Sequence, residues 1–240
     1  MKLLLSFPRS GNHLVRFFVE LLSEQPTLGV VDAPLDVSLY KNNYTKPVPF
    51  NIQPDTETLN TESYYRKSHI PPNTYDNIDE MLLILRNPRE CLIRQNGFYT
   101  WNQNYNWHSY DAYFNLANSY LKYPGKKCVF YYEDIITDRV GFVKQLYDFL
   151  GFNHPDKLQY VIDNIDELYT LCITADGRHW GGVKSNGNTN FYYPQIRELI
   201  KDQFDAYLSS RVSEPQFQFI QEKYNIPILE IHQISESKKS

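Results

Sequence analysis

The 240-residue sequence lacks a surplus of basic residues. Its 24 lysines and arginines stand against 28 aspartates and glutamates, which gives a formal net charge of −4. Binding to a nucleic-acid polymer needs a basic surface that displaces counterions, so this charge balance argues against such a partner. A small anionic ligand in a local basic pocket is still compatible with the sequence.

Long apolar runs are also missing. The chain starts with only three consecutive leucines before Pro8 and Arg9 interrupt them. A secretory signal needs roughly seven to fifteen apolar residues, and a membrane span needs about twenty. We therefore expect a cytoplasmic protein with no membrane partner.

Cysteine is scarce as well. The three cysteines, Cys91, Cys128 and Cys172, lie far apart in the chain. Their number and spacing fit neither a disulfide framework nor a zinc site. Free thiols in a reducing compartment are the simplest interpretation.

Strand patterns alternate with helix patterns along the chain. Strands are predicted over residues 2–7, 81–85 and 129–132. Helices are predicted over residues 12–22, 88–99, 111–123, 138–150, 155–165, 194–208 and 214–224, while 23–63 has no clear period. The helix that runs to Leu150 is expected to be capped by Thr137 or Asp138 and ended by Gly151. The alternation predicts an α/β fold with a central, mainly parallel sheet, whose ligands bind at the carboxyl ends of the strands. We expect a single domain over residues 1–240, with a frayed tail from about 235.

The turn after the first strand is the most informative segment. It reads Ser6-Phe7-Pro8-Arg9-Ser10-Gly11-Asn12-His13 and leads from a buried strand directly into a helix. Backbone N–H groups and the positive end of the helix dipole converge in such a turn, and Arg9, Ser10 and Asn12 add polar donors. The turn is therefore a candidate cradle for phosphate or sulfate. A plain connection with a solvent-facing arginine is the alternative, since the full nucleotide P-loop sequence is missing.

Three further segments are read together with this turn. They are Lys67-Ser68-His69-Ile70-Pro71, Leu85-Arg86-Asn87-Pro88-Arg89-Glu90, and Tyr131-Tyr132-Glu133-Asp134 with the helical stretch 143–151 behind it. In this order, and with Pro8-Arg9-Ser10-Gly11 in front, they resemble the motifs of the sulfotransferases that use 3′-phosphoadenosine-5′-phosphosulfate (PAPS). The resemblance covers residues 6 to 151. It implies a P-loop-like, three-layer α/β/α fold, PAPS as cofactor and sulfuryl transfer without a metal.

The same resemblance implies catalytic roles for Arg9, Lys67 and His69. Arg9 would stabilise the leaving oxygen, and Lys67 would assist at the transferring group. His69 would accept the proton of the acceptor hydroxyl, because an imidazole titrates near neutral pH. Without the resemblance, His69 would be interpreted as a hydrogen-bonded loop histidine and Lys67 as a surface lysine.

The implied cofactor-binding residues come from several segments. They are Arg9, Ser10, Gly11, Asn12, His13, Arg86, Arg94, Tyr132 and Arg178. Arg86 closes a buried strand, where an arginine is costly unless an anion meets it. That anion is either a 3′-phosphate or one of the carboxylates of Glu90 and Asp134. Arg94 stands where the family has a phosphate-binding serine, so it either donates to that phosphate or faces solvent.

Two other positions depart from the family pattern. Leu14 replaces the tryptophan that stacks on adenine in the family, which leaves Tyr132 as an adenine contact or as a plain strand tyrosine. The late basic-glycine loop of the family is expected within residues 177–190. Arg178 is its first basic candidate there, and Lys184 is the second.

The acceptor hydroxyl belongs to an unknown small molecule or glycan. The stretch 98–110 reads FYTWNQNYNWHSY, and Trp101, Tyr105 and Trp107 suit either a saccharide surface or a packed surface loop. Two other functions stay open. One is a P-loop kinase-like phosphotransferase, although the Lys-Ser/Thr of the nucleotide loop is missing. The other is a non-catalytic nucleotide-binding protein of the same fold.

Overall fold

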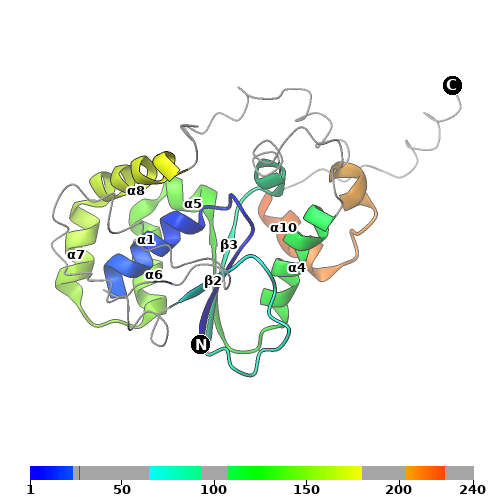
Figure 1. Cartoon of the computed structure of the whole chain (residues 1–240), viewed down its shortest axis with the longest axis horizontal. Coiled ribbons are helices and arrows are strands. Elements are labelled where there is room, and N and C mark those ends of the chain that lie inside the picture. Colours follow the sequence, from blue (N-terminus) through cyan, green and yellow to red (C-terminus); the bar gives the residue numbers. More distant parts are fainter. Residues whose placement is uncertain (24–26, 28–64, 93–107, 180–203, 225–240) are drawn as a thin grey trace, which may run out of the picture.

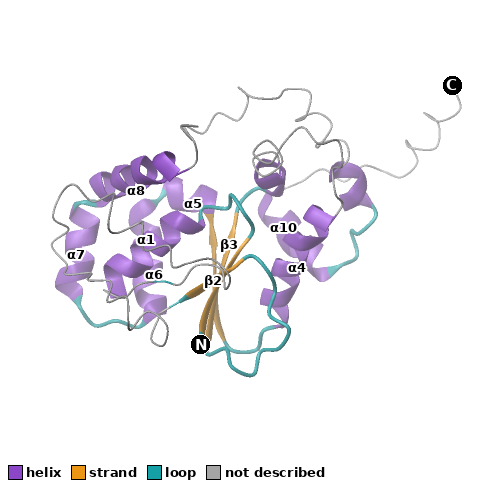
Figure 2. Ribbon diagram, viewed as in Figure 1, coloured by secondary structure: helices purple, strands orange, loops and turns teal. Residues whose placement is uncertain are grey.

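The computed structural model describes residues 1–23, 27, 65–92, 108–179 and 204–224. Its centre is a parallel sheet with the strand order β2-β1-β3-β4. The strands are β1 (Lys2–Ser6), β2 (Arg66–Ser68), β3 (Glu80–Leu85) and β4 (Lys126–Tyr131). Helices lie on both sides of the sheet (Figure 2). The predicted three-layer α/β/α fold with a parallel central sheet is thereby confirmed.

Both faces of the sheet are apolar. Successive side chains of a strand point to opposite faces, so a strand made of consecutive apolar residues presents apolar side chains to both. In β1, Leu3 and Leu5 enter one buried cluster, and Leu4 enters the other. In β3, Leu83 and Leu82 divide in the same way. Uninterrupted leucine runs therefore form central strands covered on each side.

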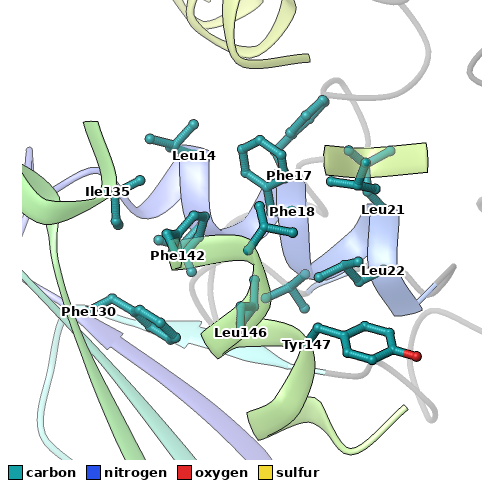
Figure 3. Close-up of a cluster of buried hydrophobic side chains, with 14 of the residues drawn as sticks. Leu14, Phe17, Phe18, Leu21, Leu22, Phe130, Ile135, Phe142, Leu146 and Tyr147 are labelled. Carbon is teal, nitrogen blue, oxygen red and sulfur yellow. The ribbon is translucent and has the colours of Figure 1, made fainter. Parts of the chain in front are cut away.

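One face is covered by α1 (Asn12–Ser23), α6 (Arg139–Leu150), α7 (Pro155–Asp163) and α8 (Ile165–His179). Figure 3 shows the centre of this layer, where side chains of α1 and α6 meet on the sheet. Phe142 of α6 packs edge-on against Phe18 of α1 and Phe130 of β4. This packing fixes the position of α1 relative to the sheet, and with it the amino end of that helix.

The other face is covered by α4 (His108–Lys122), α10 (Pro215–Tyr224) and a helical segment at 204–209. An aromatic cluster joins these helices, with Phe114 of α4 stacked on Phe204 and Phe217. Arg89 forms an ion pair with Asp205 and lies over the Phe204 ring, 5.8 Å from its centroid. The C-terminal helices are thus held against the segment that follows β3.

The predicted ends of α6 are confirmed by its capping groups. The Asp138 carboxylate accepts a hydrogen bond from Gly141 N (2.8 Å), so Asp138 rather than Thr137 is the cap. At the other end, Gly151 adopts the left-handed conformation with a φ of 73°. The local signals in this segment were sufficient to predict both ends.

Some boundaries differ from those expected. The third predicted strand begins earlier, at Lys126, and ends at Tyr131, so Tyr132 opens the short helix α5 (Tyr132–Thr137). The helix predicted over 155–165 is α7 and ends at Asp163. The helix α8 was not predicted, and it includes residues 177–179, where a loop was expected. Residues 88–92 are helical as predicted, while 93–99, 194–203 and the tail lie outside the described residues. None of the described helices is long and apolar enough to cross a membrane.

Candidate functional site

Each of the four strands delivers a candidate residue at its carboxyl end. The turn 6–13 follows β1, His69 follows β2, Arg86 follows β3, and Tyr132 follows β4. Because the strands are parallel, these ends meet at one edge of the sheet, opposite the N-terminus in Figure 1. The topology therefore brings together segments that are up to 126 positions apart in the chain.

The turn after β1 is held by Ser10 and by two left-handed residues. The Ser10 hydroxyl (2.7 Å) and the Ser10 N–H (3.2 Å) both donate to the main-chain oxygen of Phe7. Arg9 has a φ of 70° and Gly11 a φ of 94°. The buried Ser10 hydroxyl thus closes the turn instead of offering its proton to a ligand. A left-handed non-glycine residue such as Arg9 is typical of a functional turn.

The amino end of α1 opens directly behind this turn. The first hydrogen bond of the helix runs from Val15 N to Gly11 O (3.3 Å), so the N–H groups of residues 12–14 precede it at the positive end of the dipole. Asn12 is buried, and within the described chain its Oδ1 has no hydrogen-bond partner. The amino end of α1 therefore offers N–H groups of the kind that favour an anion, with Asn12 and His13 in the first helical turn, and the anion cradle stays a prediction.

His69 lies against the end of β1. Its Nδ1 is 2.5 Å from the main-chain oxygen of Ser6 and 3.4 Å from the Ser6 hydroxyl. A carbonyl oxygen only accepts, so Nδ1 carries the proton and donates. The neutral ring then has its lone pair on Nε2, which is the form that a general base needs.

Burial lowers the pKa of His69 to about 4, and the positive charges of Lys67, Arg16 and Arg9 add to this effect. Lys67 is itself buried in β2, with 9% of its surface exposed. The alternative of a solvated surface lysine is therefore wrong. The imidazole is therefore neutral over the physiological range and lies among cations. The expectation that it titrates near neutral pH is not what the structure shows, because burial disfavours the charged ring.

Arg86 lies at the end of β3 beside Tyr132. Its guanidinium carbon is 4.1 Å from the centroid of the Tyr132 ring, and its Nη1 is 3.4 Å from the main-chain oxygen of Arg9. Its Nε is buried and has no hydrogen-bond partner among the described residues. Within that part of the chain, Arg86 pairs with neither Glu90 nor Asp134, and Asp134 instead pairs with Lys223. The alternative of a carboxylate partner for Arg86 is not what the structure shows.

Tyr132 also explains the glycine of the turn. A Cβ built on Gly11 would lie 2.5 Å from Cδ2 of the Tyr132 ring, closer than side chains approach one another. Gly11 is thus required both by its positive φ and by this contact. Tyr132 joins the turn after β1 to Arg86 after β3.

Glu133 and Asn87 were not among the predicted site residues. Glu133 Oε1 accepts from the Asn87 N–H (2.9 Å), and Glu133 Oε2 accepts from the Tyr224 hydroxyl (3.1 Å). The Tyr113 hydroxyl donates to the main-chain oxygen of Arg86 (2.7 Å). The only sequence signal was the position of Glu133 directly after Tyr132, since the partners lie on distant elements.

Several predicted residues fall outside what the structure describes. They are Arg94, Lys184 and the aromatic stretch up to residue 107. Arg178 belongs to the last turn of α8, where side chains from residue 173 onward are not described. The three cysteines are free thiols, as predicted, and burial raises the pKa of Cys128 to about 11. The described residues contain no cluster of His, Cys, Asp and Glu that could hold a metal ion.

No protein-family model matches the chain, and no curated protein matches it in sequence. Solved structures do match in fold. A retinol dehydratase in complex with retinol and PAP is 16% identical, with a TM-score of 0.53 over 88% of this chain and 81% of that chain. The same kind of enzyme in complex with androsterone and PAP gives a TM-score of 0.54 at 16% identity, over 88% and 80% of the two chains. Mouse sulfotransferase SULT7A1 complexed with PAP gives a TM-score of 0.54 at 14% identity, and the match covers 93% of this chain and 88% of that chain. At these identities the similarity establishes the shared fold.

Proposed function

We propose that this chain is a sulfotransferase that moves the sulfuryl group of PAPS to a hydroxyl acceptor. The observation that carries the proposal is the meeting of an anion cradle, an arginine with a buried Nε and an oriented neutral imidazole at the carboxyl ends of four parallel strands. The bound nucleotide of the structural neighbours supports it, because PAP is what PAPS becomes after losing its sulfuryl group.

The residues of the site fit such a nucleotide at two points. The turn 6–13 and the amino end of α1 suit the 5′-phosphosulfate, because converging N–H groups and a helix dipole favour an anion. The buried Nε of Arg86 suits the 3′-phosphate, because a phosphate would supply the acceptor that it lacks in the described chain. Ser10 shapes the turn in this arrangement, and Arg94 and Arg178 stay proposed contributors.

The chain then contributes cations and a base. PAPS supplies the sulfuryl group. Arg9 and Lys67 place positive charge where the leaving oxygen becomes negative, and Arg9 cannot lose its proton. The acceptor's hydroxyl proton goes to Nε2 of His69 while the acceptor oxygen bonds to sulfur. The assignment requires no metal ligand from the protein.

The proposed acceptor is a small compound that carries a hydroxyl group. Two of the structural neighbours hold retinol or androsterone beside PAP. Ile70, the residue after His69, exposes 69% of its surface, and the Ser68 hydroxyl bonds to both its N–H and its oxygen. An exposed apolar side chain on a restrained main chain next to the base favours an acceptor with an apolar part. A saccharide on Trp101, Tyr105 and Trp107 is the second candidate.

A thermal-shift experiment followed by a transfer assay tests the proposal. We expect 3′,5′-ADP (PAP) to raise the melting temperature without magnesium, because a ligand of the native state stabilises it. Label from [³⁵S]PAPS should then appear on one member of a panel of lipophilic alcohols and saccharides. Stabilisation by Mg-ATP alone would favour the phosphotransferase. Binding of 3′,5′-ADP without transfer to any member would favour a non-catalytic nucleotide-binding protein.

A further inference from the structure

Two consecutive residues after β4 face two consecutive residues after β3. The register of the two strands ends with Leu85 opposite Tyr131. The next residues therefore lie side by side, Arg86 with Tyr132 and Asn87 with Glu133. Each of these pairs makes a direct contact.

The first contact restrains the Arg86 side chain. Its guanidinium lies over the Tyr132 ring at 4.1 Å, where the negative face of the ring attracts the cation. The ring itself is held by packing. It lies against Gly11, where an added Cβ would be 2.5 Å from its Cδ2, and Tyr132 packs on the buried hydrophobic cluster that contains α1 and α6. Tyr132 is therefore a fixed platform for the guanidinium.

The second contact restrains the main chain next to Arg86. Glu133 Oε1 accepts the N–H of Asn87, and the Asn87 side chain accepts the N–H of Arg89 (3.0 Å) at the start of the helical segment 88–92. Glu133 Oε2 is held by the hydroxyl of Tyr224 in α10. Burial, followed by the charges of neighbouring groups that include Glu133, raises the pKa of Tyr224 well above its usual range, so this hydroxyl keeps its proton.

We propose that Tyr132 and Glu133 are positioning residues for Arg86. Tyr132 orients the guanidinium, and Glu133 fixes the backbone from which it extends. The ligand for which they orient it is the 3′-phosphate of the nucleotide, so the proposal rests on the proposed function. One face of the Tyr132 ring is occupied by Arg86, and a contact between Tyr132 and adenine stays a prediction.

Positioning matters here because an arginine side chain has many rotamers. Ordering it on the phosphate would cost conformational entropy at the moment of binding. A guanidinium that is already held between a ring and the turn after β1 avoids most of that cost. The buried Nε without an acceptor is what such a prepared arginine presents to a ligand.

Matched substitutions separate positioning from general stability. Tyr132→Leu removes the ring, and Tyr132→Phe keeps it while losing the hydroxyl. Glu133→Ala removes the acceptor of the Asn87 N–H, and Glu133→Gln keeps an acceptor oxygen there. Tyr224→Phe leaves Glu133 in place and removes only the hydroxyl at its second oxygen.

Two measurements are made on each variant. The first is the mobility of the Arg86 Nε–H group by ¹⁵N NMR relaxation without any nucleotide, with the signal assigned by its loss in Arg86→Lys. The second is the ratio of the affinities for 3′,5′-ADP and 5′-AMP by calorimetry, which isolates the 3′-phosphate.

We expect Tyr132→Leu and Glu133→Ala to mobilise the Arg86 Nε–H group and to reduce the affinity ratio by about tenfold. Tyr132→Phe and Glu133→Gln should keep both values within about twofold of the wild type. An immobile Nε–H in Tyr132→Leu and Glu133→Ala, or equal losses of affinity for both nucleotides, would overturn the proposal. If wild-type protein bound neither nucleotide, the proposed function would fail, and the NMR measurement would still decide whether the two residues hold Arg86.

Discussion

The Nδ1 atom of His69 lies 2.5 Å from the main-chain oxygen of Ser6, although the two residues are 63 positions apart in the chain. The contact links the end of β2 to the end of β1, which are neighbours in the sheet. It fixes the ring orientation and leaves the lone pair on Nε2. The tautomer of the proposed base is thus a consequence of strand order.

This relationship gives a direct test of the base. His69→Ala should lose roughly 10²–10⁴-fold in turnover, the usual contribution of a general base, with little change in 3′,5′-ADP affinity. His69→Asn is the matched variant, because its amide can still donate to Ser6 O but cannot accept a proton. Both are measured by labelled transfer and calorimetry. An active His69→Asn enzyme would assign the base to another residue, and loss of nucleotide binding in both variants would make His69 structural.

The low pKa of His69 predicts how stability depends on pH. Folding lowers the pKa from 6.5 to about 4, so the neutral ring is favoured in the folded state. As pH falls below 6.5, the unfolded chain binds a proton first, and stability is lost until about pH 4. At 1.36 kcal/mol per unit, the full loss is about 3 kcal/mol. Urea unfolding at pH 7 and pH 4.5 should show most of this loss in wild type and not in His69→Asn. Identical pH dependence in both proteins would contradict the shift.

Nucleotide binding should raise that pKa again. The positive charges of Lys67, Arg16 and Arg9 help to lower it, and the phosphates of 3′,5′-ADP would offset those charges. Binding near pH 5 should therefore take up a fraction of a proton at His69. Calorimetry in two buffers of different ionisation enthalpy measures this uptake. Subtracting the value for His69→Asn removes the protons that the nucleotide itself exchanges, and a zero difference would show that the nucleotide lies far from His69.

Arg9 should lower the stability of the folded chain while supplying the cation that the transfer needs. Its φ of 70° is strained for a residue with a side chain, and glycine adopts this conformation without that cost. Arg9→Gly should therefore gain about 1 kcal/mol in the free energy of unfolding, while transfer is abolished and nucleotide binding weakens. Arg9→Lys keeps the strain and a cation, and should keep part of the turnover. Wild-type turnover in Arg9→Gly would show that the turn was misassigned.

Gly11 and Gly151 form a matched pair, because both have a positive φ. A Cβ at Gly151 meets nothing within 4 Å, whereas one at Gly11 meets the Tyr132 ring. Gly151→Ala should cost about 1 kcal/mol from backbone strain alone. Gly11→Ala should cost clearly more and also weaken 3′,5′-ADP binding, and adding Tyr132→Ala should recover part of the stability but not the binding. Urea unfolding measures these differences. Equal costs at the two glycines would mean that the ring moves aside freely.

Local signals in the sequence predicted most of the described fold. The leucine runs of β1 and β3, the cap at Asp138 and the left-handed Gly151 each depend on neighbouring residues, so short segments are sufficient to identify them. The helix α5 was missed because its six residues are too few to show a period. The helix α8 was also missed, since the predicted helix stopped at residue 165, where α8 begins.

The sequence by itself determined the chemistry available to the site, since Arg9 and Arg86 follow predicted apolar strands and Lys67 and His69 lie in a recognisable motif. The strand β2 that contains Lys67 was not predicted, because its three residues are polar. Tertiary structure decided how these groups act. Three contacts join segments that are distant in the chain. They are the hydrogen bond from His69 Nδ1 to Ser6, the guanidinium of Arg86 over the Tyr132 ring, and the hydrogen bond from the Asn87 N–H to Glu133. Such contacts depend on which strands are neighbours and in which register, and no local pattern encodes strand order. The parallel sheet brings the groups together because all of its strands end at the same edge.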